Sequence, residues 1–195
     1  IIDRQTLFAT LQQRGEPLNQ SFAGRLCEDQ GKLSFAYEQT WLDSDLFLPL
    51  SVTMHRTVEP FPDEVARPFF ENLLPEGEIR AAIARLKQIS ERNTFGLLGE
   101  IGGDCAGAIS LWPQGEKPGR NEGYAELTDT RLVEALGSMA SRPLLVIDDE
   151  LRLSLAGAQN KLPVYYDWKQ LSLPRGSDPS SHILKPEIPN LEGTV

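Results

Sequence analysis

The segment from residue 113 to residue 123 is the feature that most limits how this chain can fold. Over eleven positions it carries two prolines, three glycines and four charged side chains. Proline and glycine interrupt helices and strands, so a cluster of this kind is typical of a linker. A chain of 195 residues is long enough for two small subdomains on either side of it. We therefore predict one domain at residues 1–115 and a second at residues 124–195.

The first third of the chain reads as a small antiparallel sheet. Apolar and polar residues alternate over residues 6–11, 22–26 and 32–37, and turn-forming residues separate these runs at 14–17 and 29–31. The aromatic and aliphatic stretch that follows, Trp41, Leu42 and residues 46–50, is expected to pack across this sheet.

Helices are predicted next. Pro68 fits the first position of a helix over 69–74, and Pro75 starts a second over 76–87, with Ile79, Ile83 and Leu86 on one face. Asn93 or Thr94 can cap a third helix over 95–100. The glycines at 102 and 103 suggest a left-handed stop for that helix, followed by a strand over 105–112.

The second domain combines one helix with several strands. Thr128 can cap a helix over 129–139 that buries Leu132, Val133 and Leu136. Strands are expected over 151–155, 162–166, 170–173 and 182–185. The fold class is therefore α+β: a small antiparallel sheet with helices, followed by a strand-rich unit. The three tryptophans are expected in the core or at an interface between subdomains.

Composition restricts where the protein works. The longest apolar runs fall far below the roughly 18 residues that span a bilayer, so no membrane helix is expected. The start lacks the pattern of a signal peptide, and it also lacks a methionine, which hints that the chain is not a whole gene product. Two isolated cysteines, Cys27 and Cys105, favour a reducing compartment over a disulfide scaffold. We predict a cytoplasmic protein without a membrane partner.

Charge is distributed unevenly along the chain. The net charge is −9, which argues against broad direct binding of nucleic acid. Residues 1–150 hold 14 basic and 24 acidic side chains, a balance of −10, whereas residues 151–195 hold 5 and 4, a balance of +1. An anionic ligand is therefore more readily placed in the last quarter.

Two segments of that quarter could bind phosphate. In residues 152–161, RLSLAGAQNK, a predicted strand enters three very small residues and returns to a strand after Lys161. Small side chains let backbone N–H groups approach an anion closely. A second lysine, Lys185, ends the apolar strand HILK, an order that kinases use to hold nucleotide phosphates. Taken singly, these features also suit an ordinary hairpin turn and a solvated surface lysine.

Four segments together resemble a known family. Residues 69–77 (FFENLLPEG), 99–109 (GEIGGDCAGAI), 155–161 (LAGAQNK) and 182–186 (HILKP) resemble, in this order, the signature segments of the HipA family. HipA-family proteins are bacterial serine/threonine kinases, the toxins of toxin-antitoxin modules that pair with a DNA-binding HipB antitoxin. The resemblance implies that the second domain begins a kinase nucleotide-binding lobe.

The resemblance also implies roles for individual residues. Lys185 would contact the ATP phosphates, and Ser154 matches the family position that becomes autophosphorylated and silences the enzyme. Asn160 departs from the acidic residue common before the loop lysine. The residues implied to cover the ATP phosphates are Leu155, Ala156, Gly157, Ala158, Gln159, Asn160 and Lys161. The implied cofactors are ATP and Mg²⁺, and the implied partners are a HipB-like antitoxin, DNA only through that antitoxin, and a protein substrate.

The family's base-like Asp and its Mg²⁺-binding Asn and Asp lie well downstream of the strand lysine. Only ten residues follow Lys185 here, without a matching pattern. The chain alone is therefore expected to lack catalytic and metal-binding residues and to be inactive as a kinase. The alternative is a non-catalytic module that docks on a partner kinase or antitoxin.

Overall fold

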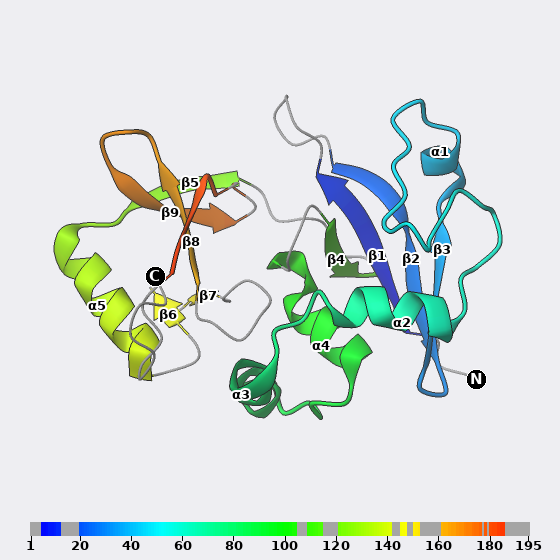
Figure 1. Ribbon diagram of the computed structural model, residues 1–195, viewed down its shortest axis with the longest axis horizontal. Helices are drawn as coiled ribbons and strands as arrows, with labels where there is room; N and C mark the ends of the chain where they lie inside the picture. The colour runs from blue at the N-terminus through cyan, green and yellow to red at the C-terminus, as the bar shows by residue number, and fades with distance from the viewer. Residues whose placement is uncertain are drawn as a thin grey trace. The chain divides into compact units, whose positions relative to one another are not determined.

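The computed structural model describes residues 5–12, 20–104, 109–114, 121–141, 145–147, 150–152, 161–176, 178 and 180–185. Two compact units emerge: Ile1–Leu74 with Arg92–Lys117, and Pro75–Glu91 with Pro118–Val195. Each contains antiparallel strands and helices, which confirms the predicted α+β class (Figure 1). The domain limits at 115 and 124 stay a prediction. No described helix is long and apolar enough to cross a bilayer.

The first unit is built on a four-stranded antiparallel sheet. Its strands lie in the order β3-β2-β1-β4, and their bounds are β1 Gln5–Gln12, β2 Gln20–Asp29, β3 Lys32–Tyr37 and β4 Ile109–Pro113. The three predicted hairpin strands are confirmed. Gln30 and Gly31 have φ values of 51° and 78°, which suit the tight turn between β2 and β3. The buried strand residues are Leu7, Ala9, Ala23, Leu26, Leu33, Phe35, Tyr37, Ile109 and Leu111.

Helix α2, Asp63–Glu71, packs beside β3 and is tied to it by one carboxylate. The Asp63 carboxylate accepts hydrogen bonds from the backbone N–H of Leu33 at 2.6 Å and from Arg67 Nε at 3.0 Å. Arg67 also donates to the carbonyl oxygen of Gly31 at 2.6 Å, in the β2–β3 turn. The bond from Arg67 is the main cause that lowers the pKa of Asp63.

Pro68 does not begin a helix, so that prediction is wrong. It lies inside α2, which starts five residues earlier at Asp63. A proline inside a helix removes the bond from its own nitrogen and crowds the carbonyl group four residues earlier, here that of Glu64. Because Glu64 is exposed, water can satisfy that oxygen, and α2 continues through Pro68.

The segment after β3 packs only in part. Helix α1, Gln39–Leu42, buries Trp41 and Leu42 as predicted. Leu46 and Leu48, however, are 61% and 67% exposed, so the expectation that residues 46–50 pack across the sheet is wrong for both. They lie in a loop that the hydroxyl group of Tyr37 holds through backbone atoms.

Helix α4, Thr94–Ile101, is capped as predicted: Asn93 Oδ1 accepts the N–H of Gly96 at 2.8 Å. The predicted left-handed stop is wrong, because Gly102 has φ −66° and the chain continues into the 3₁₀ turn η1, Gly102–Asp104. Gly102 is needed for close approach instead. A Cβ atom there would lie 2.7 Å from the Cβ of Leu111 in β4.

The second unit has two sheets, a four-stranded one in the order β10-β8-β9-β5 and the hairpin β6-β7. Strands β5 and β6 were not predicted, and β5 begins at Asn121, inside the linker predicted at residues 113–123. The element bounds are α3 Gly77–Lys87, β5 Asn121–Glu126, α5 Asp129–Ser141, β6 Leu145–Ile147, β7 Glu150–Arg152, β8 Leu162–Tyr166, β9 Leu171–Gly176 and β10 His182–Leu184. Ile79 and Ile83 of α3 are buried as predicted, but Leu86, near its last turn, is 56% exposed.

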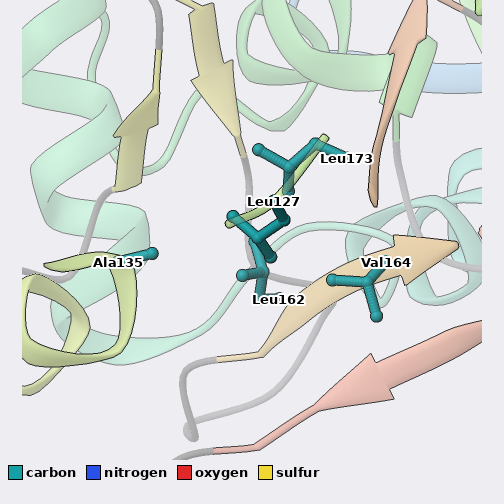
Figure 2. Close-up of a cluster of buried hydrophobic side chains, with 5 residues drawn as sticks. All are labelled: Leu127, Ala135, Leu162, Val164 and Leu173. Atoms are coloured by element: carbon teal, nitrogen blue, oxygen red, sulfur yellow. The ribbon is translucent and has the colours of Figure 1, made fainter. Parts of the chain in front are cut away.

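A compact apolar cluster joins α5 to one face of the larger sheet. It consists of Leu127, Ala135, Leu162, Val164 and Leu173, all at most 5% exposed (Figure 2). Leu132 and Leu136 of α5 pack against the cluster, as their spacing predicted. Val133 is 70% exposed because it lies on the opposite side of the helix, so its predicted burial is wrong. The other face of the sheet is not covered by α5.

Candidate nucleotide phosphate site

The predicted phosphate loop falls between strands β7 and β8. Strand β7 ends at Arg152, and β8 begins at Leu162, directly after Lys161. Of the predicted site residues, the structure describes Lys161 and Lys185. The remaining ones, Ser154, Leu155, Ala156, Gly157, Ala158, Gln159 and Asn160, lie outside the described residues.

The register of β8 and β10 brings the two lysines together. The strands pair antiparallel, with His182 opposite Val164 and Leu184 opposite Leu162. Continued one step beyond the ends of both strands, this register sets Lys185 opposite Lys161. Directly opposed residues in an antiparallel pair have Cα atoms about 4.5–5.5 Å apart. Two lysines that are 24 positions apart in the sequence therefore meet at one end of this strand pair.

Both lysines belong to the sheet face that is turned away from the α5 cluster. Side chains alternate along a strand, and Leu162 and Val164 are in the cluster, so Lys161 takes the other face. On β10, Leu184 packs against the cluster, which gives Lys185 the same face as Lys161. Lys185 is exposed and Lys161 is half-buried.

This arrangement suits an anion with several negative oxygens. Like charges directly opposite each other destabilise a strand pair. An anion bound between two ammonium groups relieves that repulsion, and lysine is a common phosphate ligand in the form of a point charge. A di- or triphosphate has enough oxygens to contact both lysines at once.

An aromatic pair lies on the same face of the sheet, and the sequence analysis did not identify it. Tyr124 of β5 stacks on Tyr165 of β8, with ring centroids 4.2 Å apart. The pKa of Tyr124 is raised, mainly by burial and then by the charge of Asp178. Asp178 accepts the backbone N–H of Gly123 at 2.7 Å. The alternation in Leu162–Tyr166 could have placed Tyr165 opposite the cluster, but its partner on β5 lies 41 positions away.

A second set of rings surrounds His182. Its ring lies 5.7 Å from that of Tyr166 and 6.1 Å from that of Trp168, edge-on to both. Ser181 Oγ lies 2.8 Å from His182 Nδ1. Trp168 is 80% exposed with φ 72°, so its predicted place in a core is wrong. It occupies a tight turn in which the Asp167 carboxylate accepts two backbone N–H groups.

No described set of three His, Cys, Asp or Glu side chains is arranged to hold a metal ion. The two ammonium groups can bind and orient a nucleotide phosphate.

Comparison with known proteins identifies the family to which this chain is similar. Residues 17–112 match the model described as the HipA N-terminal domain. The protein of Sinorhizobium fredii named "Putative kinase Y4mE" is 39% identical over 178 residues, which are 88% of this chain and 42% of that protein. The serine/threonine-protein kinase toxin HipA of Shewanella oneidensis is 30% identical, over 83% of this chain and 37% of that protein. The chain thus spans about two fifths of the length of these relatives.

A solved structure has the same fold. It is the complex of HipA, HipB and operator DNA from Shewanella oneidensis MR-1, with a TM-score of 0.63 and 28% sequence identity. The match covers 90% of this chain and 40% of the solved chain. The two antiparallel sheets with their helices therefore define an α+β protein of the HipA type. The chain belongs to the HipA family, as its four sequence segments indicated.

Proposed function

We propose that this chain is the amino-terminal part of a HipA-like serine/threonine protein kinase. The complete enzyme transfers the γ-phosphate of ATP to a serine or threonine of a protein substrate, a component of translation in the toxin members. The observation that carries the proposal is the antiparallel register of β8 and β10, which, continued by one step, sets Lys185 opposite Lys161. The strand order around them supports it, since β7 and β8 flank the small-residue loop.

Each residue of the proposed site has a part in binding. Leu155, Ala156, Gly157, Ala158, Gln159, Asn160 and Lys161 cover the ATP phosphates, and Lys185 contacts them from the neighbouring strand. Mg²⁺, when bound, neutralises phosphate oxygens, and its ligands belong to the part of the enzyme beyond this chain. Ser154 follows β7 by two positions, so a phosphate on it would bring about two negative charges beside the anion site. That repulsion would expel the loop and silence the enzyme.

The proposed partners follow from the solved neighbour. That structure contains HipA, HipB and operator DNA, which supports a HipB-like antitoxin as the partner of this chain and DNA contact through the antitoxin. The net charge of −9 agrees with an indirect contact to DNA. Co-expression with a small DNA-binding protein encoded beside the gene should yield a complex in size-exclusion chromatography. Separate elution of the two proteins at micromolar concentration would argue against this partner.

The proposed kinase is tested on the longest product of the gene. Phosphate transfer from γ-labelled ATP to protein should fall at least about tenfold in Lys161→Gln and in Lys185→Gln, since each loses a charge-assisted phosphate contact. Lys169→Gln is the matched control, because Lys169 is an exposed lysine in the β8–β9 turn, at the other end of β8. Equal loss in all three variants, or no transfer by the native product, would contradict the proposal.

This chain alone is expected to bind Mg-ATP weakly or not at all, because it spans only about two fifths of the length of its kinase relatives. Isothermal titration measures this directly. Micromolar affinity would show that the described lobe suffices for nucleotide binding. The rival function, a module that docks on a separate kinase or antitoxin, is favoured if the native product ends at Val195 and a separate kinase gene lies beside it.

A further inference from the structure

Lys185 directly follows strand β10, which is weakly fixed by apolar packing. The strand has only three residues, and two of them, His182 and Ile183, are exposed. Leu184 alone packs against the α5 cluster, and it is half-buried. The register of a strand is well specified where one face is fully buried and weakly specified otherwise. Burial therefore does little to decide which residue of β10 lies opposite Lys161.

Polar contacts made by the residue just before β10 can fix the register of β10 on β8. The N–H of Ser181 donates to the carbonyl oxygen of Val164 at 2.9 Å. The hydroxyl oxygen of Ser181 accepts the N–H of Tyr166 at 2.8 Å, so a side chain takes the place of a backbone acceptor in the ladder. Ser181 thereby binds β8 at two points, two residues apart on the same strand.

The same hydroxyl group also orients His182. Because its oxygen accepts from Tyr166, its own proton can be donated to His182 Nδ1, 2.8 Å away. The imidazole ring then contacts the rings of Tyr166 and Trp168. Side chains from β8 and the β8–β9 turn thus converge on His182, which Ser181 orients, at the end of the strand pair remote from the two lysines.

We propose that Ser181 is a positioning residue that sets the register of β10 on β8 and so holds Lys185 opposite Lys161. A slip of one residue would break both bonds to Ser181. It would also move Lys185 by about 3.3 Å along the strand and reverse the face on which it lies. The consequence for phosphate binding rests on the proposed kinase function, whereas the register itself does not.

Disulfide trapping measures the register directly. Cysteines replace both lysines (Lys161→Cys and Lys185→Cys) in a chain whose natural cysteines carry Cys27→Ser and Cys105→Ser. Directly opposed residues fall within the Cα separation that a disulfide requires. The cross-link should form readily with Ser181 and with Ser181→Thr, which keeps the hydroxyl group. It should form about tenfold more slowly in Ser181→Ala, as expected for the loss of about one net hydrogen bond.

Ser180→Ala is the matched control, because Ser180 is the exposed neighbouring serine. It should leave the rate of cross-linking unchanged. Far-ultraviolet circular dichroism and amide protection of Leu173 in the core cluster show whether each variant is folded. Equal cross-linking rates in folded Ser181→Ala and in the parent would overturn the proposal, and so would failure of Ser181→Thr to restore the rate.

A second measurement separates this inference from the proposed function. Millimolar Mg-ATP is titrated into the longest product of the gene, with both lysines kept, and the amide resonances of Lys161 and Lys185 are followed. We expect shifts with Ser181 and Ser181→Thr and about tenfold weaker apparent affinity in Ser181→Ala. If ATP shifts neither lysine while cross-linking still depends on Ser181, the nucleotide function fails and the register inference stands. If cross-linking is independent of Ser181, the inference fails whatever ATP does.

Discussion

Removing the hydroxyl group of Tyr37 should destabilise the first unit measurably. This hydroxyl group donates to the carbonyl oxygen of Met54 at 2.7 Å and accepts the N–H of Leu50 at 2.8 Å. Tyr37 is 7% exposed and Met54 is fully buried. Burial raises the pKa of Tyr37, and the bond from Leu50 partly opposes that rise. One buried oxygen atom thus fixes the loop that follows α1 through two backbone groups.

The magnitude follows from what Tyr37→Phe removes and what it keeps. The ring packing remains, since the centroid of the Tyr37 ring lies 5.1 Å from that of Phe35 and 5.2 Å from that of Phe47. Two hydrogen bonds are lost, each with a net value of about 0.5–1.5 kcal/mol. The expected loss in the free energy of unfolding is therefore about 1–3 kcal/mol, with the lower end applying if water reaches the two freed groups.

Urea unfolding of the chain tests this value. The two units can unfold separately, so the probe must report on the first one. A Trp168→Phe background leaves Trp41 and Trp112, both in the first unit, as the tryptophans that emit. Tyr165→Phe, in the second unit, is the control and should leave this transition unchanged. A loss below about 0.5 kcal/mol for Tyr37→Phe would refute the idea that the hydroxyl group holds the loop.

Other contacts give further predictions. Because the folded pKa of Asp63 is lowered, its bond to Arg67 stabilises the protein above the ordinary carboxyl pKa of 3.8 and is lost as the pH falls below it. Urea midpoints measured between neutral pH and pH about 3 should show this loss, and Asp63→Asn should remove it at a cost of about 1–2 kcal/mol at neutral pH. Asn93→Ala should cost about 1 kcal/mol by loss of the α4 cap, whereas Asn93→Asp should keep most of it, measured by thermal unfolding. Gly24→Ala should cost about 1–3 kcal/mol or more, because its Cβ would overlap a backbone oxygen of β3, while Gly99→Ala meets only one methyl group at 3.8 Å and should be neutral or stabilising. Equal midpoints for the two glycine variants would contradict the packing argument.

Local sequence signals sufficed for much of the fold. Alternation with bounding turn residues located β1, β2, β3 and β8, because a sheet buried on one face imposes that pattern directly. Asn93 marked the start of α4 because its side chain bonds a backbone N–H three positions ahead. Such contacts lie within a few residues, so they can be recognised from the sequence.

Long-range packing decided the features that were misjudged. Gly102 suggested a left-handed stop, but its small size is required by Leu111, which approaches from β4. Pro68 suggested a helix start, but the helix begins at Asp63, whose carboxylate binds the β2–β3 hairpin 30 positions away. The residue types were informative in both cases. The element that made use of them was distant in the sequence and could not be inferred locally.

For the candidate site, the sequence predicted the residues but not their arrangement. The family resemblance and the small-residue loop pointed to Lys161 and Lys185. The sequence did not predict that they are directly opposed, because that depends on the register of β10, which has only three residues. Tyr165 and Ser181 were missed for the same reason. Their contacts join strands across a sheet, and no spacing rule within one strand reveals them.

The intrinsic fluorescence of Trp168, in the β8–β9 turn, can report on the position of β10. The indole ring of Trp168 is 80% exposed and touches the imidazole of His182, the first residue of β10. Trp41 is buried and Trp112 is half-buried, so both should emit at shorter wavelengths than Trp168. Detachment of β10 from β8 would remove the imidazole from the indole and change the long-wavelength emission. Movement of β10, the strand directly before Lys185, can therefore be followed by tryptophan fluorescence without an added label.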